Sequence, residues 1–234
     1  MLIQLTQIQC RVIGVLLEKE KTTPDQYPLT LNALTLGCNQ KSNREPVMQL
    51  SESEVQNTLD DLRDKNLTFE VSGSGSRVLK YKHRFCNTEF NSLKFTEQQV
   101  AIICVTLLRG PQSAGELRTR TNRLAEFGNS EDVEAALLSL TEESVDHNGE
   151  KIMVKLAREP GKRDSRFTHL FSGAPSIMIA NEPNSAAAYK PDLNIQNVND
   201  VGSSSADKAR IESLEIQVMA LTQEIRAIKE ALGL

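Results

Sequence analysis

Apolar positions in the first half of the chain follow a set of spacings that returns, in the same order, in the second half. The segment LTQIQCRVIGVLL (5–17) matches FTEQQVAIICVTL (95–107), and both have the period of a buried helix. Further on, SEVQNTLDDL (53–62) matches EDVEAALLSL (131–140), with apolar residues at the same three places. Because both the elements and their order repeat, the pattern predicts two copies of one domain of roughly 80 residues.

The starts of the two matching helices carry the same capping signal. Thr6 is followed three residues later by Gln9, and Thr96 is followed by Gln99 in the same way. In a capping box the hydroxyl and the amide each bind a backbone N–H that the helix leaves without a partner. The sequence therefore predicts that a helix begins at each of these two threonines.

Each copy is predicted to end in two strands joined by a turn. In the first copy LTFEV (67–71) alternates apolar and polar residues, SGSGS forms a turn, and RVLKYKHRF (77–85) returns. In the second copy KIMVKLA (151–157) leads through a Pro–Gly turn into RFTHLF (166–171). Three helices and a β-hairpin make up a winged helix. The predicted fold class is α+β, with tandem winged-helix domains over residues 1–90 and 91–172.

The remaining chain changes in composition and then regains a helical period. Residues 173–206 are rich in Ala, Asn, Pro and Ser, which predicts a flexible linker. Residues 207–232 carry an apolar heptad seam, which predicts a short coiled-coil-like helix. A helix this short is marginal alone in water, so it must pack against something. We expect a homo-oligomer formed through this helix, with the folded domains or another protein as the alternatives.

Four segments resemble the YceH family of bacterial proteins. They are TTPDQYPLTLNALTLGCNQKSNREPV (23–47), GSRVLKYKHRF (75–85), GELRTRTNRL (115–124) and REPGKRDSRFTHLFSG (158–173). One departure is Phe167, which stands where the resemblance would place a tyrosine. The resemblance implies tandem winged-helix domains, and it implies no established biochemical activity.

Composition excludes several classes of function. The net charge of −4 gives no overall attraction to nucleic acid or to an anionic membrane. No apolar run approaches the ~18 residues of a membrane span, and no signal peptide is visible, so we expect a cytoplasmic protein. The four cysteines are far apart and lack histidines at ligand spacing, which argues against a metal. Cys10 and Cys104 lie in apolar helical runs and are expected to be buried free thiols.

The sequence offers no catalytic constellation. His83 and His169 occupy equivalent places between aromatic residues on predicted strands, which favours packing or hydrogen bonding. His147 lies outside any metal or nucleophile motif, and no phosphate-binding loop is present. We therefore expect a protein that is not an enzyme and that carries no cofactor.

Charges on the predicted third helices and on the wings differ in sign. The outward faces of the third helices are rich in carboxylates, which repel DNA phosphates, although Gln56 and Asn57 have side chains that can bind adenine edges. The cations gather on the two wings and on the second helix of the second copy. They are Arg77, Lys80, Lys82, Arg84, Arg118, Arg120, Arg123, Arg158, Lys162, Arg163 and Arg166. These cations are either solvated faces or a surface that holds phosphates without reading bases.

The stretch QYPLTLNALTLGCNQKSNREPV (26–47) holds a second helix and a long polar connection. LTLNALT (29–35) parallels SAGELRT (113–119), and Pro28 suits the first turn of that helix. Gly37 and Asn39 are candidates for its end. The connection after it is either a hydrogen-bonded loop or a binding loop, and its absence from the second copy favours binding. The candidate binding residues of this loop are Lys41, Asn43 and Arg44.

Two functional hypotheses follow from these patterns. The first is DNA association through the basic wings and the loop from Lys41 to Arg44. The second is a protein-interaction module that does not read DNA, similar to the winged helices of ScpB-type partners in bacterial chromosome-organising complexes. The repeated wing cations favour the first, and the acidic third helices favour the second.

Overall fold

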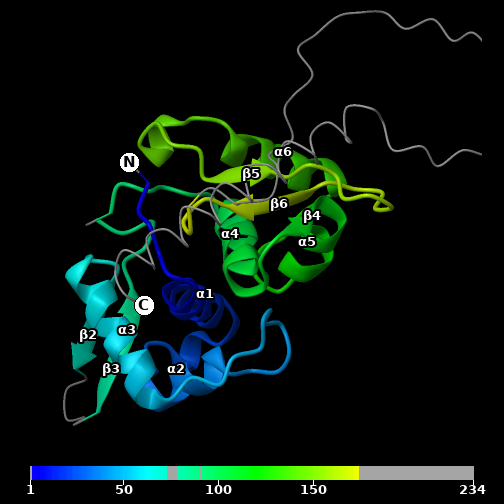
Figure 1. The fold of residues 1–234 in the computed structure, drawn as a ribbon. Helices are drawn as coiled ribbons and strands as arrows, with labels where there is room; N and C mark the ends of the chain where they lie inside the picture. Colours follow the sequence, from blue (N-terminus) through cyan, green and yellow to red (C-terminus); the bar gives the residue numbers. More distant parts are fainter. Residues whose placement is uncertain (1, 73–77, 90, 174–234) are drawn as a thin grey trace, which may run out of the picture. The chain divides into compact units, whose positions relative to one another are not determined.

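The computed structural model describes residues 2–72, 78–89 and 91–173 (Figure 1). All of these belong to one of two units, residues 1–183, into which the chain divides. The predicted helix at 207–232, nearly all of the predicted linker, and Arg77 lie outside the described residues. The expected homo-oligomer therefore stays a prediction.

The described chain is of the α+β class, and its first half contains three helices, a 3-10 turn and three strands. In chain order these are α1 (Gln7–Thr22), η1 (Pro24–Gln26), β1 (Leu29–Thr30), α2 (Leu31–Cys38), α3 (Glu52–Asp64), β2 (Thr68–Ser72) and β3 (Leu79–His83). The second half repeats this order apart from the position of the 3-10 turn. Its elements are α4 (Glu97–Arg109), β4 (Gln112–Ser113), α5 (Ala114–Thr121), α6 (Ser130–Thr141), η2 (Val145–His147), β5 (Met153–Lys155) and β6 (Arg166–His169).

Each half builds one three-stranded antiparallel sheet with the same strand order. The orders are β1-β3-β2 and β4-β6-β5, so the last strand of each half lies in the middle. Leu29 pairs with Tyr81 in the first sheet, and Gln112 pairs with Phe167 in the second. The hairpin strands were predicted from their alternation. The two-residue edge strands β1 and β4 were not predicted.

The predicted helix starts are confirmed. The Thr6 hydroxyl accepts from the Gln9 backbone N–H at 3.2 Å, and the Gln9 amide oxygen accepts from the Thr6 N–H at 3.1 Å. Thr96 and Gln99 make the same reciprocal pair at the start of α4. The matching apolar residues of α3 and α6 are also buried, as their spacing predicted: Val55, Leu59, Leu62, Val133, Leu137 and Leu140.

Three expectations about the second helix were wrong in detail. The helix is capped by Thr30 and begins at Leu31, so Pro28 lies before β1 instead of in the first helical turn. The cap of α5 is Ser113, which therefore corresponds to Thr30, the cap of α2. The sequence comparison had aligned Ser113 with Leu29, one residue too early. Asn39 ends α2 as predicted, but Gly37 lies inside the helix. An added Cβ at Gly37 would lie 2.7 Å from Cγ1 of Val15, so this glycine allows α2 to approach α1.

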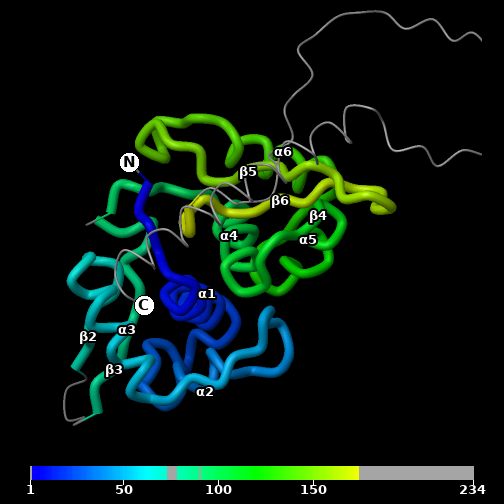
Figure 2. Tube along the Cα trace, in the orientation of Figure 1, coloured from blue at the N-terminus to red at the C-terminus, as the bar shows by residue number. Residues whose placement is uncertain are grey.

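The two halves share one continuous hydrophobic core centred on α1 and α4. Figure 2 shows these two helices side by side. At their contact an added Cβ on Gly14 would lie 2.8 Å from Cδ2 of Leu108, and the Cys104 thiol reaches the Gly14 carbonyl at 3.4 Å. The rings of Phe85 and Phe171 also meet edge to face across the halves, 4.9 Å between centroids. The duplicated units are therefore packed as one body.

No helix in the described part of the chain is both long and apolar enough to cross a membrane.

Candidate binding surfaces

The first hairpin presents cations together with an aromatic ring on one face. Lys80 and Lys82 alternate along β3 with the buried Tyr81 and His83, and Arg84 continues the alternation. Phe69 lies directly opposite Lys82 on β2. The Lys82 Nζ lies 4.8 Å from the Phe69 ring centroid, and the Arg84 Cζ lies 4.3 Å from it. The ring thus attracts two of the three cations and holds them on this face.

The opposite face of this hairpin carries Tyr81 and His83, which are both buried and hydrogen-bonded. His83 Nε2 lies 2.9 Å from Oε2 of Glu20, and its backbone N–H donates to the Tyr27 hydroxyl at 3.0 Å. The hydrogen bond between the His83 ring and the Glu20 carboxylate is the main reason why the pKa of Glu20 is lowered. Tyr81 is buried and donates its hydroxyl to Gln56 of α3 at 2.9 Å. His83 thus has the hydrogen-bonding role that its place on the strand predicted.

Helix α3 exposes a stripe of polar and acidic side chains. Its exposed positions at helical spacing include Glu54, Asn57, Asp61 and Asp64. The cation of this helix, Arg63, forms ion pairs with Asp60 at 3.2 Å and with Glu70 of β2 at 2.7 Å. Gln56 is occupied by Tyr81 and Asp60, which leaves Asn57 as the exposed one of the two predicted adenine-reading residues.

Helix α6 exposes a corresponding stripe that contains one large apolar residue. Leu138 is 59% exposed, and Glu131 and Glu134 lie on the same side at helical spacing. Glu142 follows as the C-cap residue, with an extended backbone. Single exposed apolar side chains are common on protein surfaces, and this one is distinguished by the glutamates near it.

Some of the cations of the second copy gather around one hollow. Lys162 and Arg163, from the connection between β5 and β6, line it together with Arg166, and its volume is about 230 Å³. Glu116, Glu159 and Asp164 line the same hollow, so its charge is mixed. Arg158 is exposed in the same connection. Two further predicted cations of this copy have partners: Arg120 pairs with Glu116 at 3.3 Å, and Arg118 donates to the Ser130 hydroxyl. Arg123 is exposed.

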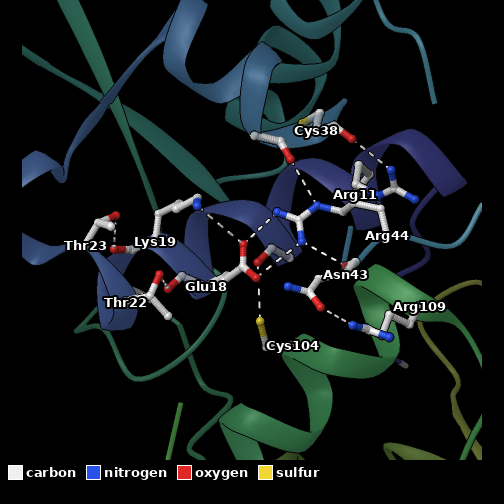
Figure 3. Close-up of polar contacts among 12 residues, drawn as sticks. Arg11, Glu18, Lys19, Thr22, Thr23, Cys38, Asn43, Arg44, Cys104 and Arg109 are labelled. Atoms are coloured by element: carbon white, nitrogen blue, oxygen red, sulfur yellow. Dashed lines mark hydrogen bonds and ion pairs between the residues drawn. The ribbon is translucent and has the colours of Figure 1, made fainter. Parts of the chain in front are cut away.

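Arg44 has a different environment from the one expected, because its side chain is not at the surface. The guanidinium is 0% exposed and makes a two-pronged ion pair with Glu18 of α1, at 2.6 Å and 3.3 Å (Figure 3). Its Nε also donates to the Gly37 carbonyl at 3.0 Å. A side chain held in this way cannot reach another macromolecule, so Arg44 is removed from the candidate surface. At Arg44, the connection after α2 is therefore a hydrogen-bonded loop, which was the alternative to a binding loop.

The same loop also contacts the second copy. Asn43 accepts a hydrogen bond from Arg109 at the end of α4 (Figure 3). The Glu45 N–H donates to the Leu108 carbonyl at 2.9 Å. The long connection, which the second copy lacks, thus joins α2 to α4. Lys41 stays exposed beside it.

Sequence analysis missed the charged residues of α1 that hold this loop. Arg11 is buried, and it donates to the carbonyls of Cys38 at 2.9 Å and Pro46 at 2.6 Å. Glu18 lies on the same helix, two turns further along. The available signal was a charged residue within an otherwise apolar helical run, because such a residue needs a buried partner.

The described residues contain no cluster suited to metal binding or thiol chemistry. No group of three or more His, Cys, Asp or Glu within them could hold a metal ion. All four cysteines are buried and free, and burial raises the pKa of Cys38 and of Cys86 to about 12. Because the thiolate is the reactive form, these side chains are chemically inert at neutral pH. Cys10 and Cys104 are buried free thiols, as predicted.

Comparison with known proteins shows the family. Residues 5–162 match the family model described as a protein of unknown function, DUF480, and the chain belongs to this family. A UPF0502 protein of Pseudoalteromonas atlantica is 55% identical over 232 residues, which cover 99% of this chain and 98% of that protein. A second, from Photobacterium profundum, is 54% identical over 98% of this chain and 97% of its own length. These matches confirm the predicted resemblance to an uncharacterised bacterial family.

Proposed function

We propose that this protein is a non-enzymatic, cytoplasmic tandem winged-helix protein that holds duplex DNA through the phosphate backbone. The face of the first hairpin formed by Lys80, Lys82, Arg84 and Phe69, here called the first-wing face, carries this proposal.

The arrangement of each half supports the winged-helix assignment. Each half has three helices and a three-stranded antiparallel sheet whose last two strands form a hairpin. In a winged helix the third helix follows the second across a turn, and the hairpin extends beside it. The order of α1 to β3, and of α4 to β6, fits this description.

Charge on the first-wing face supports contact with phosphates. Its cations are at alternate residues, and alternate side chains of a strand point to the same face. Glu70, the carboxylate of β2, pairs with Tyr81 and points to the opposite face. Contacts to phosphate position a protein on a duplex without reading sequence.

The acidic stripe of α3 restricts how the duplex can be held. Three carboxylates on the exposed side of this helix would meet the phosphates on both sides of a groove. We therefore propose a wing-led contact without helix-in-groove readout, which predicts weak sequence preference and strong salt dependence.

A salt titration tests this proposal. Binding of a labelled duplex is measured by fluorescence anisotropy at increasing salt for the full chain, for the double variant Lys80→Gln/Lys82→Gln, and for the control Lys94→Gln/Lys151→Gln. Both doubles remove two positive charges, but the control positions are exposed and lie off the first-wing face. The first double should lower the salt slope by about 2, since each phosphate contact contributes about 0.9. An equal effect of the two doubles, or no binding at low salt, would refute the proposal.

A second candidate function is docking of a partner protein on α6, and the exposure of Leu138 among glutamates favours it. The partner would have to present an apolar side chain flanked by cations. Cross-linking from position 138 in cells, with Leu138→Gln as the comparison, would identify it. If a position-138 probe captures nothing, this candidate is rejected.

A further inference from the structure

A polar hollow lies where the loop after α2 meets α1 and the second copy. Its volume is about 440 Å³, within the range of small-molecule sites. Lys19 lines it from α1, Lys41 from the loop, and Arg123 from the turn that follows α5. The three cations therefore come from three separate segments and face the same space.

The hollow has a positive charge because its carboxylate is already neutralised. Glu18 is its acidic lining residue, and it is held by the buried guanidinium of Arg44 at 2.6 Å. Lys19 lies 3.9 Å from the same carboxylate oxygen, a long contact that leaves its ammonium donors available. Among the described residues, Lys41 and Arg123 have no ion-pair partner.

The remaining lining groups are neutral hydrogen-bonding side chains. Ser42 supplies a hydroxyl, and Gln40 and Asn43 supply amides, whereas the Thr22 hydroxyl already donates to the Glu18 carbonyl at 2.9 Å. The Asn43 amide oxygen accepts from Arg109, and Figure 3 shows its nitrogen turned away from that guanidinium. Cations together with neutral donors are the groups that bind phosphate oxygens. The walls include no large apolar side chain, so the site does not suit an apolar ligand.

We propose that this hollow is a binding site for the phosphate group of a small phosphorylated compound. Lys41 and Arg123 hold the charge of the ligand, and Ser42 and the Asn43 amide bind its oxygens. The buried pair of Glu18 and Arg44 fixes the loop, so that these groups face the space before the ligand arrives.

The concave shape favours a small ligand over the backbone of a duplex. The first-wing face is built from β2 and β3, whereas the hollow is lined from α1, the loop and the segment after α5. The proposal therefore goes beyond DNA association and does not depend on it.

Calorimetric titration with inorganic pyrophosphate tests the site in the full chain. The double variant Lys41→Ser/Arg123→Gln should weaken pyrophosphate binding by about tenfold or more, because it removes two of the three cations that face the hollow. The matched control Lys151→Ser/Arg118→Gln removes the same residue types outside the hollow and should leave affinity unchanged. Thermal unfolding of both doubles checks that they fold.

The outcomes separate the possible sources of the phosphate. Equal affinity in the wild type and both doubles, or no heat of binding at millimolar pyrophosphate, would overturn the proposal. If pyrophosphate does not bind but the Lys41/Arg123 double loses duplex binding, the hollow holds a backbone phosphate and the small-ligand proposal is wrong. If the Lys41/Arg123 double loses pyrophosphate binding while its duplex binding is unchanged, the small-ligand proposal is supported. This holds whatever the result for the first-wing face.

Discussion

Replacing Arg44 by methionine should destabilise the protein far more than replacing an exposed arginine. Arg44→Met keeps most of the side-chain volume but removes the partner of Glu18, whose own side chain is 8% exposed. It also removes the donor to the Gly37 carbonyl. The variant therefore leaves a charge and a carbonyl in the interior without compensation.

The magnitude follows from the burial of the pair. Removing one partner of a buried ion pair costs about 3–5 kcal/mol, because the other charge stays desolvated. For a folded unit of this size, each kcal/mol lowers the midpoint of thermal unfolding by about 2–4 °C. The expected fall in midpoint is therefore roughly 6–20 °C.

Arg63 provides a matched control. Its distance to Glu70 is 2.7 Å, nearly the same as in the buried pair, but the Arg63 side chain is 50% exposed. Arg63→Met should therefore cost only about 0–1 kcal/mol. Circular dichroism during heating and denaturant titration measures both variants under the same conditions.

A third variant separates charge burial from packing. In Glu18→Met/Arg44→Met neither charge is present, so most of the lost stability should return. If Arg44→Met costs no more than Arg63→Met, or if the double variant is as unstable as the sum of its single variants, the assignment of the loss to an unpaired buried charge is refuted.

Three further predictions concern other parts of the fold. Burial lowers the pKa of His169 to about 4, below its value of 6.5 in the unfolded chain. The free energy of unfolding should therefore be highest above pH 6.5 and fall by about 3 kcal/mol as the pH drops towards 4, and His169→Leu should flatten this pH profile. Gly14→Ala should lower the free energy of unfolding by about 1–2 kcal/mol because its Cβ would meet Leu108, whereas Gly115→Ala has open space and should raise it by up to about 1 kcal/mol in denaturant titration; the same sign for both would contradict this. Thr96→Ala should cost about 1 kcal/mol in the same assay by removing the cap of α4, and an unchanged midpoint would show that the capping box adds no stability.

The elements with long periodic patterns could be predicted from the sequence, and the shortest ones could not. Helix α3 repeats its apolar residues over several turns, and the threonine caps mark where α1 and α4 begin. Strands β1 and β4 have two residues each, which is too short for any alternation to be visible. They form because the middle strand of each sheet has a free edge that a short extended segment can pair with.

The candidate site shows the same limit for single side chains. Sequence pattern found the cations of the first wing because they alternate along one strand. It misplaced Arg44 because the partner that buries it, Glu18, is on α1, far from the loop in the sequence. The charge of Glu18 within an apolar helical run indicates a buried partner, but it does not indicate which residue that partner is. Gly37 looked like a helix end, since nothing in the local sequence indicates that Val15 lies against it.

The contact between α1 and α4 has a consequence for how this protein can be divided. A chain cut in the segment between Asn87 and Lys94 would expose the Gly14 side of α1 and the Leu108 side of α4 to water. We therefore expect neither half to fold stably alone, although each contains a complete set of helices and strands. An isolated half should aggregate unless its exposed helix is redesigned.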